Sequence, residues 1–295
     1  MTSWNNTDIP SQAGRTFVVT GANSGLGLAT TSALAAAGAR VVMAVRDTTR
    51  GSAAAAAISG TTEVRQLDLA DLSSIRRFAA EWEGPVDVLI NNAGVMAIPE
   101  ARTKDGFEMQ FGTNHLGHFA LTNLLLPHLT DRVVNVSSDL HRRGTIVLDD
   151  LNWNTRPYKP WPAYGQSKLA NLLFTLELER RLEQDHSPLR AHAAHPGYAA
   201  TNLQGHSGKP LVDRFMSVGN AVFAQSGEMG ALPTLFAATQ DLPGASYLGP
   251  SGFGGMRGYP ALAARTSAAS DPELAKKLWV ASEELTSVSY PSLVS

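Results

Sequence analysis

A tyrosine and a lysine four residues apart are the side chains in this sequence best placed to do chemistry. Tyr164 and Lys168 stand at the start of a strongly helical run. Residues four apart lie on the same face of a helix, so this spacing would bring the lysine ammonium close to the phenol. A free tyrosine titrates near pH ~10, and a nearby positive charge lowers that pKa. The pair could therefore act as an acid–base group near neutral pH; the alternative is a core tyrosine beside a lysine that reaches out to water.

The elements that must position this pair alternate between strand and helix. Strands are predicted at residues 15–20, 41–45, 63–67, 86–90, 132–136 and 190–195; helices are predicted at 25–37, 48–58, 72–82, 164–184, 227–239 and 271–286, and an amphipathic segment at 106–129. This alternation predicts an α/β fold of three layers, α/β/α, around a doubly wound parallel sheet. No linker-like boundary interrupts the 295 residues, so we expect a single domain over 1–295 rather than two small ones.

A glycine-rich turn joins the first predicted strand to the first predicted helix. It runs from Thr20 to Gly27 with the spacing T-G-x-x-x-G-x-G, which differs from the G-x-G-x-x-G of typical dinucleotide folds. Glycines permit a tight turn and let the backbone approach a pyrophosphate, while the helix N-terminus supplies N–H groups and partial positive charge. The turn therefore predicts a dinucleotide site, and the alternative is a purely structural turn.

The end of the second predicted strand bears on which dinucleotide would bind. NAD-specific proteins of this type usually place a carboxylate there for the ribose 2′-hydroxyl, whereas an arginine accommodates a 2′-phosphate. Here Val45 occupies the acidic position and Arg46 follows it, which favours NADP(H) over NAD(H). Asp47 leaves an alternative open, because its carboxylate could pair with Arg46 or itself hold the ribose.

Two long irregular segments leave the expected carboxyl ends of strands, where open α/β sheets bind ligands. Residues 139–162 carry Trp153 and Trp161, and residues 196–226 contain apolar side chains near helical spacing at 211–218, bracketed by glycines. We expect 196–226 to form a substrate lid whose apolar face, with the two tryptophans, makes a lipophilic pocket. The alternative is a short helix packed permanently on the core.

Composition excludes several classes of protein. The chain has 24 basic and 26 acidic residues without charge blocks, so neither a nucleic-acid surface nor an anionic-membrane patch is expected. It has no cysteine, which removes disulfides, thiolate catalysis and thiolate metal sites. His115 and His118, three apart on an expected helix, could pair as metal ligands, but no third ligand stands at a recognisable spacing, so no metal is expected.

The N-terminus, residues 1–14, is polar and lacks the apolar core of a secretory signal, so it is predicted to be a polar extension. The longest apolar runs, such as 119–126, are far shorter than the ~20 residues that span a bilayer. A cytoplasmic protein without a membrane anchor is the expectation.

These motifs, in this order, resemble the short-chain dehydrogenase/reductase family over nearly the whole chain. The resemblance rests on Thr20–Gly27, Asp68-Leu69, Asn91-Asn92-Ala93-Gly94, Asn114, Ser137-Ser138, Tyr164 with Lys168, and Pro196-Gly197 with Thr201. The sequences around Asn114 and Lys168, and the insert before Tyr164, are similar to the branch that contains retinol dehydrogenases and protochlorophyllide reductase. A Rossmann-like fold is implied.

The resemblance also implies roles for individual residues. Tyr164 would exchange a proton with the substrate oxygen, Ser138 would hydrogen-bond that oxygen, Lys168 would lower the tyrosine pKa and bind the nicotinamide ribose, and Asn114 would hold a water of a proton relay. Ser137 is the rival of Ser138, although strand alternation places the two on opposite faces. The cofactor would be bound by Gly21, Asn23, Ser24, Gly25, Leu26, Gly27, Arg46, Asp68, Leu69, Asn91, Ala93, Gly94, Tyr164, Lys168, Pro196, Gly197 and Thr201.

The sequence thus predicts an NADP(H)-dependent oxidoreductase that interconverts an alcohol and a carbonyl compound by hydride transfer, on a lipophilic small molecule. Two alternatives remain: reduction of a carbon–carbon double bond, and a cofactor-binding regulatory protein without turnover. Helices of this family often pair between subunits, so a homo-oligomer is expected by analogy.

Overall fold

The computed structural model describes residues 3–198 and 226–291, and within them eight strands form one sheet in the order β3-β2-β1-β4-β5-β6-β7-β8. The strands are β1 Thr16–Thr20, β2 Arg40–Val45, β3 Thr61–Gln66, β4 Val86–Asn91, β5 Leu129–Val136, β6 Arg190–Ala194, β7 Tyr247–Pro250 and β8 Pro260–Leu262. Strands β1 to β7 pair in parallel, and the order reverses between β1 and β4. The predicted doubly wound sheet is therefore confirmed, with the switch point where such sheets bind ligands.

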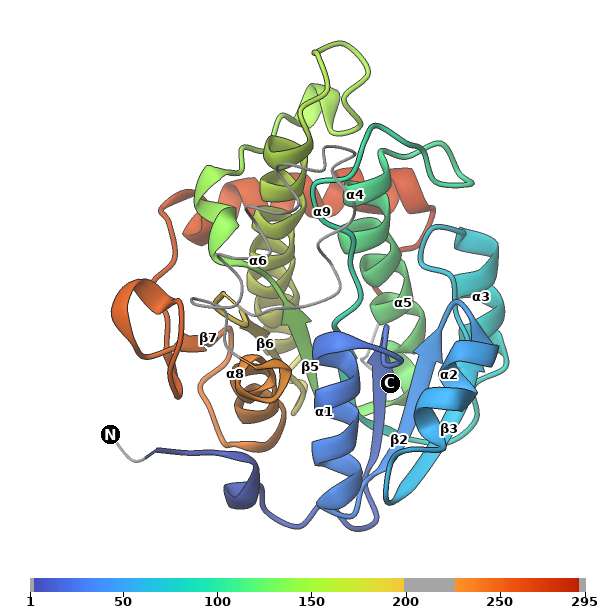
Figure 1. Cartoon of the computed structure of the whole chain (residues 1–295). Coiled ribbons are helices and arrows are strands. Elements are labelled where there is room, and N and C mark those ends of the chain that lie inside the picture. The colour runs from blue at the N-terminus through green and yellow to red at the C-terminus, as the bar shows by residue number, and fades with distance from the viewer. Residues whose placement is uncertain (1–2, 199–225, 292–295) are drawn as a thin grey trace, which may run out of the picture.

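Helices cover both faces of the sheet (Figure 1). One face packs against α1 Gly25–Ala36, α2 Thr48–Ala55 and α8 Gly227–Thr239. The other packs against α3 Leu72–Ala80, α5 Gly117–Leu125 and α6 Pro160–Gln184, and α9 Pro272–Thr286 lies across α6. This gives the three layers that the sequence predicts.

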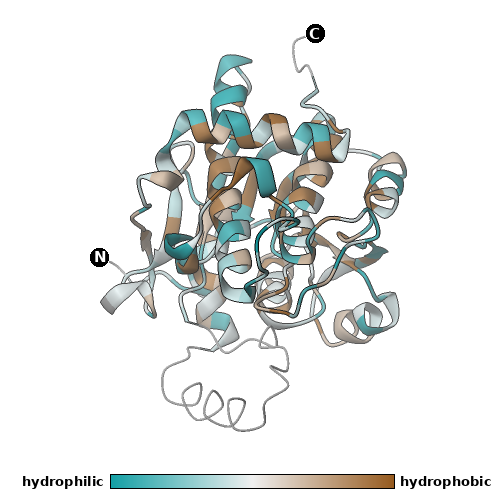
Figure 2. Cartoon of the chain, turned by 90° about the horizontal axis from the view of Figure 1, so that it is seen from above, coloured by the Kyte–Doolittle hydropathy of each residue, from teal (hydrophilic) through white to brown (hydrophobic). Residues whose placement is uncertain are grey.

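Strands β1 and β2 read as continuous apolar runs because both of their faces are buried. In β1, Phe17 and Val19 belong to the core on the α1 side, while Val18 between them belongs to the core on the α3 side. Seen from above, hydrophobic residues gather in the middle of the molecule and hydrophilic ones toward its edges (Figure 2). A sheet buried in this way leaves its strand ends as the places for polar chemistry.

Several element boundaries differ from the prediction. Helix α6 begins at Pro160 rather than residue 164, because proline is tolerated in the first turn, where its missing N–H would have no partner. The amphipathic segment at 106–129 is not one helix: a short α4 Met109–Phe111 leads into a π-helix at Gly112–Leu116 before α5. The short strands β7 and β8 were missed, since they lie among glycines and prolines, and β8 is antiparallel to β7.

The N-terminal segment, predicted to be a polar extension over residues 1–14, contacts the rest of the domain. In its described part, from residue 3, the Trp4 ring meets the Phe236 ring of α8 edge-on, with 5.1 Å between centroids. Gln12 is buried and its backbone N–H donates to the Ala37 carbonyl at 2.8 Å. The polar composition of this segment gave no indication of these few contacts.

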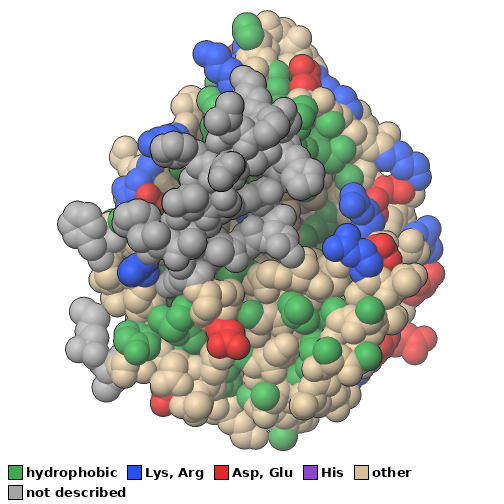
Figure 3. Space-filling model, in the orientation of Figure 1, with side chains coloured by type: hydrophobic (Ala, Val, Ile, Leu, Met, Phe, Trp, Pro, Cys, Tyr) green, Lys and Arg blue, Asp and Glu red, His purple; other side chains and the backbone are tan. Residues whose placement is uncertain are grey.

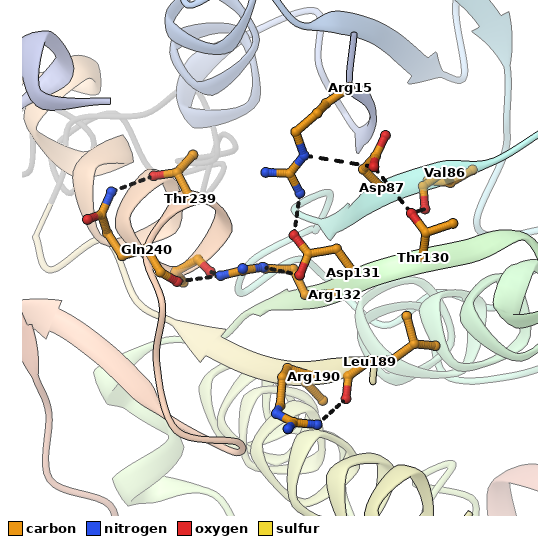
Figure 4. Close-up of polar contacts among 12 residues, drawn as sticks. Arg15, Val86, Asp87, Thr130, Asp131, Arg132, Leu189, Arg190, Thr239 and Gln240 are labelled. Atoms are coloured by element: carbon orange, nitrogen blue, oxygen red, sulfur yellow. Dashed lines mark hydrogen bonds and ion pairs between the residues drawn. The ribbon is translucent and has the colours of Figure 1, made fainter. Parts of the chain in front are cut away.

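Charged side chains tie the strands together at their amino ends (Figure 4). Arg15, just before β1, forms ion pairs with Asp87 of β4 and Asp131 of β5. Arg132 pairs with Asp131 at 3.0 Å and donates to the Ala237 carbonyl of α8 at 3.3 Å. This network holds the edge of the sheet opposite to the one that carries the candidate site.

Candidate active site

A groove of about 650 Å³ runs along the carboxyl ends of β1 to β4. Its walls are the turn between β1 and α1, the ends of β2 and β3, and the loop after β4. The predicted cofactor residues that line it are Gly21, Asn23, Ser24, Gly25, Leu26, Gly27, Arg46, Asp68, Leu69, Ala93 and Gly94. Four segments far apart in the sequence therefore meet in one elongated cleft.

The turn between β1 and α1 fits the phosphates of a dinucleotide. Gly21 has φ +65°, a left-handed conformation that disfavours other residues, and a Cβ at Gly27 would lie 2.4 Å from the Gly21 carbonyl oxygen. Ser24 is the N-cap of α1, and its side chain accepts no capping hydrogen bond from the described residues. The first-turn N–H groups of α1 therefore face the groove without a side-chain cap, as phosphate binding requires.

The far end of the groove carries two arginines. Asp47 is the N-cap of α2, where its side chain accepts from the Arg50 backbone N–H at 3.0 Å. Arg46 and Arg50 both line the groove, and within residues 3–198 and 226–291 neither guanidinium has an ion-pair partner. Lysine and arginine side chains are visible on this side of the molecule, near α2 and α3 (Figure 3). Sequence reasoning missed Arg50, although its place in the first turn after Asp47 was the available signal.

Asn91 does not line the groove, contrary to the prediction. Its side chain is buried in the core, where Nδ2 donates to Thr122 Oγ1 at 2.9 Å and to Asn135 Oδ1 at 2.8 Å. The next residue takes its place, because alternate residues at a strand end point in opposite directions. Asn92 lines the groove and its Nδ2 donates to the Thr20 carbonyl at 2.8 Å.

The predicted acid–base pair lies on α6, as expected. Lys168 Nζ is 5.7 Å from the centroid of the Tyr164 ring and donates to the Val136 carbonyl at 2.9 Å. The side chain of Ser138 lies close enough to the Tyr164 phenol to lower its pKa. Ser137 turns the other way, and its hydroxyl donates to the Lys168 carbonyl at 2.8 Å. The geometry therefore puts Ser138, and not its rival, beside the phenol.

Burial dominates the ionisation of this pair. It raises the pKa of Tyr164 to about 12, against a smaller lowering by the nearby side chain of Ser138. It lowers the pKa of Lys168 to about 8. Desolvation, and not the lysine, dominates the tyrosine pKa in this arrangement, in which the ammonium donates to the Val136 carbonyl.

Asn114 joins the loop after β4 to α6. Its Oδ1 accepts from the Val95 N–H at 2.8 Å, while its Nδ2 donates to the Val95 carbonyl and to Ser167 Oγ, both at 2.9 Å. A Cβ at Gly94 would lie 3.1 Å from Asn114 Oδ1 and 3.6 Å from Lys168 Nζ. Asn114 and Lys168 thus adjoin the groove at Gly94. Asn114 also sits in the π-helix, a rare distortion that often marks functional sites.

The predicted residues after β6 are described only in part. Pro196 and Gly197 follow that strand at the same edge of the sheet, and Gly197 has φ +68°. Thr201 and most of the expected lid at 196–226, including its apolar segment at 211–218, lie outside the described residues. In the other irregular segment, Trp153 is buried, with the Arg156 guanidinium 3.7 Å from its ring centroid, so it packs within the insert rather than lining the groove.

Most of the chain also matches a known protein family. Residues 15–211 match the model for the short chain dehydrogenases. The chain belongs to this family. It is therefore an oxidoreductase, of a family that binds NAD(P) cofactors.

Individual relatives place the chain more closely. Retinol dehydrogenase 13 of Homo sapiens is 44% identical over 303 residues, which cover 96% of this chain and 89% of that protein. Polyprenol dehydrogenase of Mus musculus is 39% identical over 297 residues, covering 94% and 85%. A solved structure from Mycobacterium paratuberculosis, of a protein without assigned function, is 56% identical with a TM-score of 0.87, covering 98% of this chain and 100% of that one. The resemblance to the retinol dehydrogenase branch is confirmed.

Two further features of this short-chain dehydrogenase concern metals and membranes. Among the described residues, no three histidine or carboxylate side chains are grouped so that they could hold a metal ion. His115 and His118 do not face a common point, since His115 meets Ser282 of α9 and His118 meets Thr20 of β1. The helices in the described part of the chain are all too short or too polar to cross a bilayer.

Proposed function

We propose that this short-chain dehydrogenase interconverts an alcohol and a carbonyl compound on a lipophilic substrate and prefers NADP(H). The observation that carries the proposal is the buried Tyr164 phenol, with the side chain of Ser138 near it and Lys168 on the same face of α6. The bound dinucleotide would supply or accept the hydride at its nicotinamide ring. The remaining chemistry is the movement of one proton to or from the substrate oxygen.

Tyr164 would make that transfer. Its raised pKa keeps the phenol protonated at neutral pH, which suits a group that donates a proton to a carbonyl oxygen. In the reverse direction the phenolate would have to form first, so oxidation of the alcohol would become faster as the pH rises. Ser138 would hydrogen-bond the same oxygen. Lys168, one helical turn after Tyr164 on α6, would bind the ribose next to the nicotinamide.

The preference for NADP(H) rests on the arginine end of the groove. A 2′-phosphate is a dianion that charge-assisted hydrogen bonds from guanidinium groups bind well. Arg46 and Arg50 line that end, and Asp47 is engaged by the N-terminus of α2. A carboxylate that caps a helix is less available to the ribose 2′-hydroxyl of NAD(H), so the alternative left open by Asp47 is disfavoured.

The lipophilic substrate is supported by the names of two relatives and by the groove itself. Retinol and polyprenol, the alcohols in those names, are largely hydrocarbon. In this chain Met96, Ile98 and Met109 line the groove on the side of the loop after β4. Apolar side chains beside a single reacting oxygen favour a substrate that buries methylene groups.

A chain-length series tests the proposal. Each buried methylene contributes ~0.8 kcal/mol, so kcat/KM for reduction should rise up to about fourfold per methylene from short to medium aliphatic aldehydes. The assay follows oxidation of NADPH, with NADH in parallel, and charged sugars and hydroxy acids serve as comparison substrates. A flat or falling profile, or faster turnover of the charged compounds, would contradict the lipophilic substrate.

A further inference from the structure

His118 lies behind the groove and contacts two motifs at once. It belongs to α5 and its side chain is buried, with 2% of its surface exposed. Its Nε2 is 2.9 Å from Thr20 Oγ1, in the turn after β1, and its Nδ1 is 3.0 Å from the Asn114 carbonyl oxygen, in the π-helix. The imidazole therefore bridges the dinucleotide turn and the candidate catalytic asparagine.

The partners of Thr20 fix the direction of these hydrogen bonds. Its Oγ1 accepts from the backbone N–H groups of Asn92 and Ala93, both at 2.9 Å. The hydroxyl hydrogen is then free to donate, and His118 Nε2 at 2.9 Å is a closer acceptor than the Ile90 carbonyl at 3.4 Å. Nε2 thus accepts, and Nδ1 carries the hydrogen that it donates to the Asn114 carbonyl. Burial lowers the pKa of His118 to about 4, which keeps this neutral form through the physiological range.

The contacts close a ring around the loop after β4. Thr20 holds the N–H groups of Asn92 and Ala93, and Asn114 holds both polar groups of the Val95 backbone. His118 joins Thr20 to Asn114 and so completes the circuit. The residues inside the ring, 92–95, line the groove at the point where it meets Lys168.

We propose that His118 is a positioning residue, which sets the 92–95 loop and the Asn114 backbone for the dinucleotide without itself exchanging protons. The proposal rests on the dinucleotide site of the proposed function. Without the imidazole, the Thr20 hydroxyl and the Asn114 carbonyl would each lose a buried partner, and the loop between them would be held from one side only.

His115 provides a matched control on the same helical segment. It is equally buried, and its Nε2 also meets a hydroxyl at 2.9 Å, that of Ser282. Its neighbours are the aromatic rings of Phe111, Phe119 and Phe174, away from the groove. Loss of either imidazole should cost stability, but only loss of His118 should reach the loop.

The experiment compares His118→Leu with His115→Leu in the full-length protein. Hydrogen exchange of the peptide spanning residues 90–97, measured without cofactor, should become at least about fivefold faster in His118→Leu and stay unchanged in His115→Leu, since two hydrogen bonds of typical strength are lost. NADPH affinity, from its fluorescence, should fall about 5–20-fold in His118→Leu only. His118→Gln, which can accept from Thr20, and His118→Asn, which can donate to Asn114, should each recover part of the affinity.

Three outcomes would overturn the proposal. Equal exchange and equal NADPH affinity in the two leucine variants would show that His118 is only a core residue. If His118→Leu does not fold, the other two variants decide. Hydrogen exchange and NADPH affinity equal to those of the wild type in both His118→Gln and His118→Asn would also show that His118 is only a core residue. Disappearance of an ionisation from the pH profile of kcat in these variants would make His118 a proton carrier instead. Failure of the wild type to bind NADPH would contradict the proposed function separately, because the exchange comparison does not need cofactor.

Discussion

Burial shapes the chemistry of Tyr164 and Lys168 at the scale of single residues. Both side chains are more than nine-tenths buried, and each has its ionised form disfavoured by desolvation. The residue types and their spacing on α6 could be predicted from the sequence, because a four-residue interval alone places them on one face. The direction in which the tyrosine pKa shifts could not be predicted, because it depends on how tertiary packing removes water and on where the lysine ammonium points.

Replacing Lys168 should therefore stabilise the protein while it removes activity. The pKa of Lys168 is about 8 in the fold against a usual 10.5, so the charged form, present below pH 8, costs up to about 3 kcal/mol at pH 7. This cost falls as the pH rises from 8 to 10.5. We expect Lys168→Met to raise the free energy of unfolding in urea by about 1–3 kcal/mol at pH 7 and by about half as much at pH 9.5. This range already subtracts the loss of the hydrogen bond from Lys168 to the Val136 carbonyl.

The control is Lys276→Met, which removes an exposed lysine of α9 and should leave both stability and turnover nearly unchanged. A Lys168→Met variant that is less stable than the wild type at pH 7 would show that the ammonium is a structural anchor. A variant that retains turnover would contradict the role of the lysine in activity.

Arg46 allows a second prediction at this scale. If its guanidinium binds the 2′-phosphate, Arg46→Ala loses a charge-assisted hydrogen bond of about 1.5–3 kcal/mol for NADPH only. The ratio of NADPH to NADH affinity, from fluorescence titration, should fall at least about tenfold. Arg190→Ala, at the opposite edge of the sheet (Figure 4), should leave the ratio unchanged. An equal loss for both cofactors would mean that Arg46 only supports the end of β2.

At the scale of elements, some features follow from local sequence and others from close packing. Helices α1 and α8 have the predicted limits to within a residue; Gly38 follows the end of α1. No local sequence pattern predicts the π-helix at Gly112–Leu116, since its formation depends on residues that are distant in the sequence. A Cβ at Gly112 would lie 2.5 Å from Thr103 Cγ2, and one at Gly117 would lie 2.5 Å from the Leu69 carbonyl oxygen. Gly112 lets the π-helix approach Thr103 in the segment after β4, and Gly117 lets α5 approach the loop after β3, which lines the groove.

Gly117→Ala should therefore disturb the site through a neighbouring element. The new methyl group would meet the Leu69 backbone, which cannot rotate away as a side chain would. We expect a loss of about 1–3 kcal/mol in the free energy of unfolding and weaker dinucleotide binding. Gly227→Ala, at the start of α8, is the control, since its new atom would make only an ordinary 4.0 Å contact with the Gly25 carbonyl oxygen, and it should be nearly neutral. Wild-type stability and affinity in Gly117→Ala would show that the approach of the two elements is not tight.

At the scale of the whole molecule, the C-terminal helix covers the outer side of α6. Trp279 of α9 is buried between Phe119 of α5 and Phe174 of α6, with ring centroids 4.9 and 5.6 Å away, and Arg181 lies 4.4 Å above its ring. The sequence predicted this helix, but not the surface against which it packs. A homo-oligomer, expected by analogy through paired helices, would have to use a face that α9 leaves open.

Trp279→Ala tests how much this cover contributes. Removal of a fully buried tryptophan typically costs about 3–5 kcal/mol, so the midpoint of urea unfolding should fall strongly. Val280→Ala, the adjacent and exposed position, should change it by less than about 0.5 kcal/mol. Similar small effects at both positions would mean that α9 is loosely attached and that the α5–α6 face is accessible to a partner.

The most direct test of the account is the turnover of Tyr164→Phe. This change removes the phenol hydroxyl and keeps the ring, so it should lower kcat for aldehyde reduction at pH 7 by roughly 10²–10⁴-fold, the usual contribution of general acid–base catalysis. The affinity for NADPH, measured separately by fluorescence, should stay within about twofold of the wild type, as should the free energy of unfolding, since burial favours the neutral ring. Near-normal turnover by a variant that binds NADPH normally would contradict the assignment of Tyr164 as the proton donor, and with it the central claim about this site.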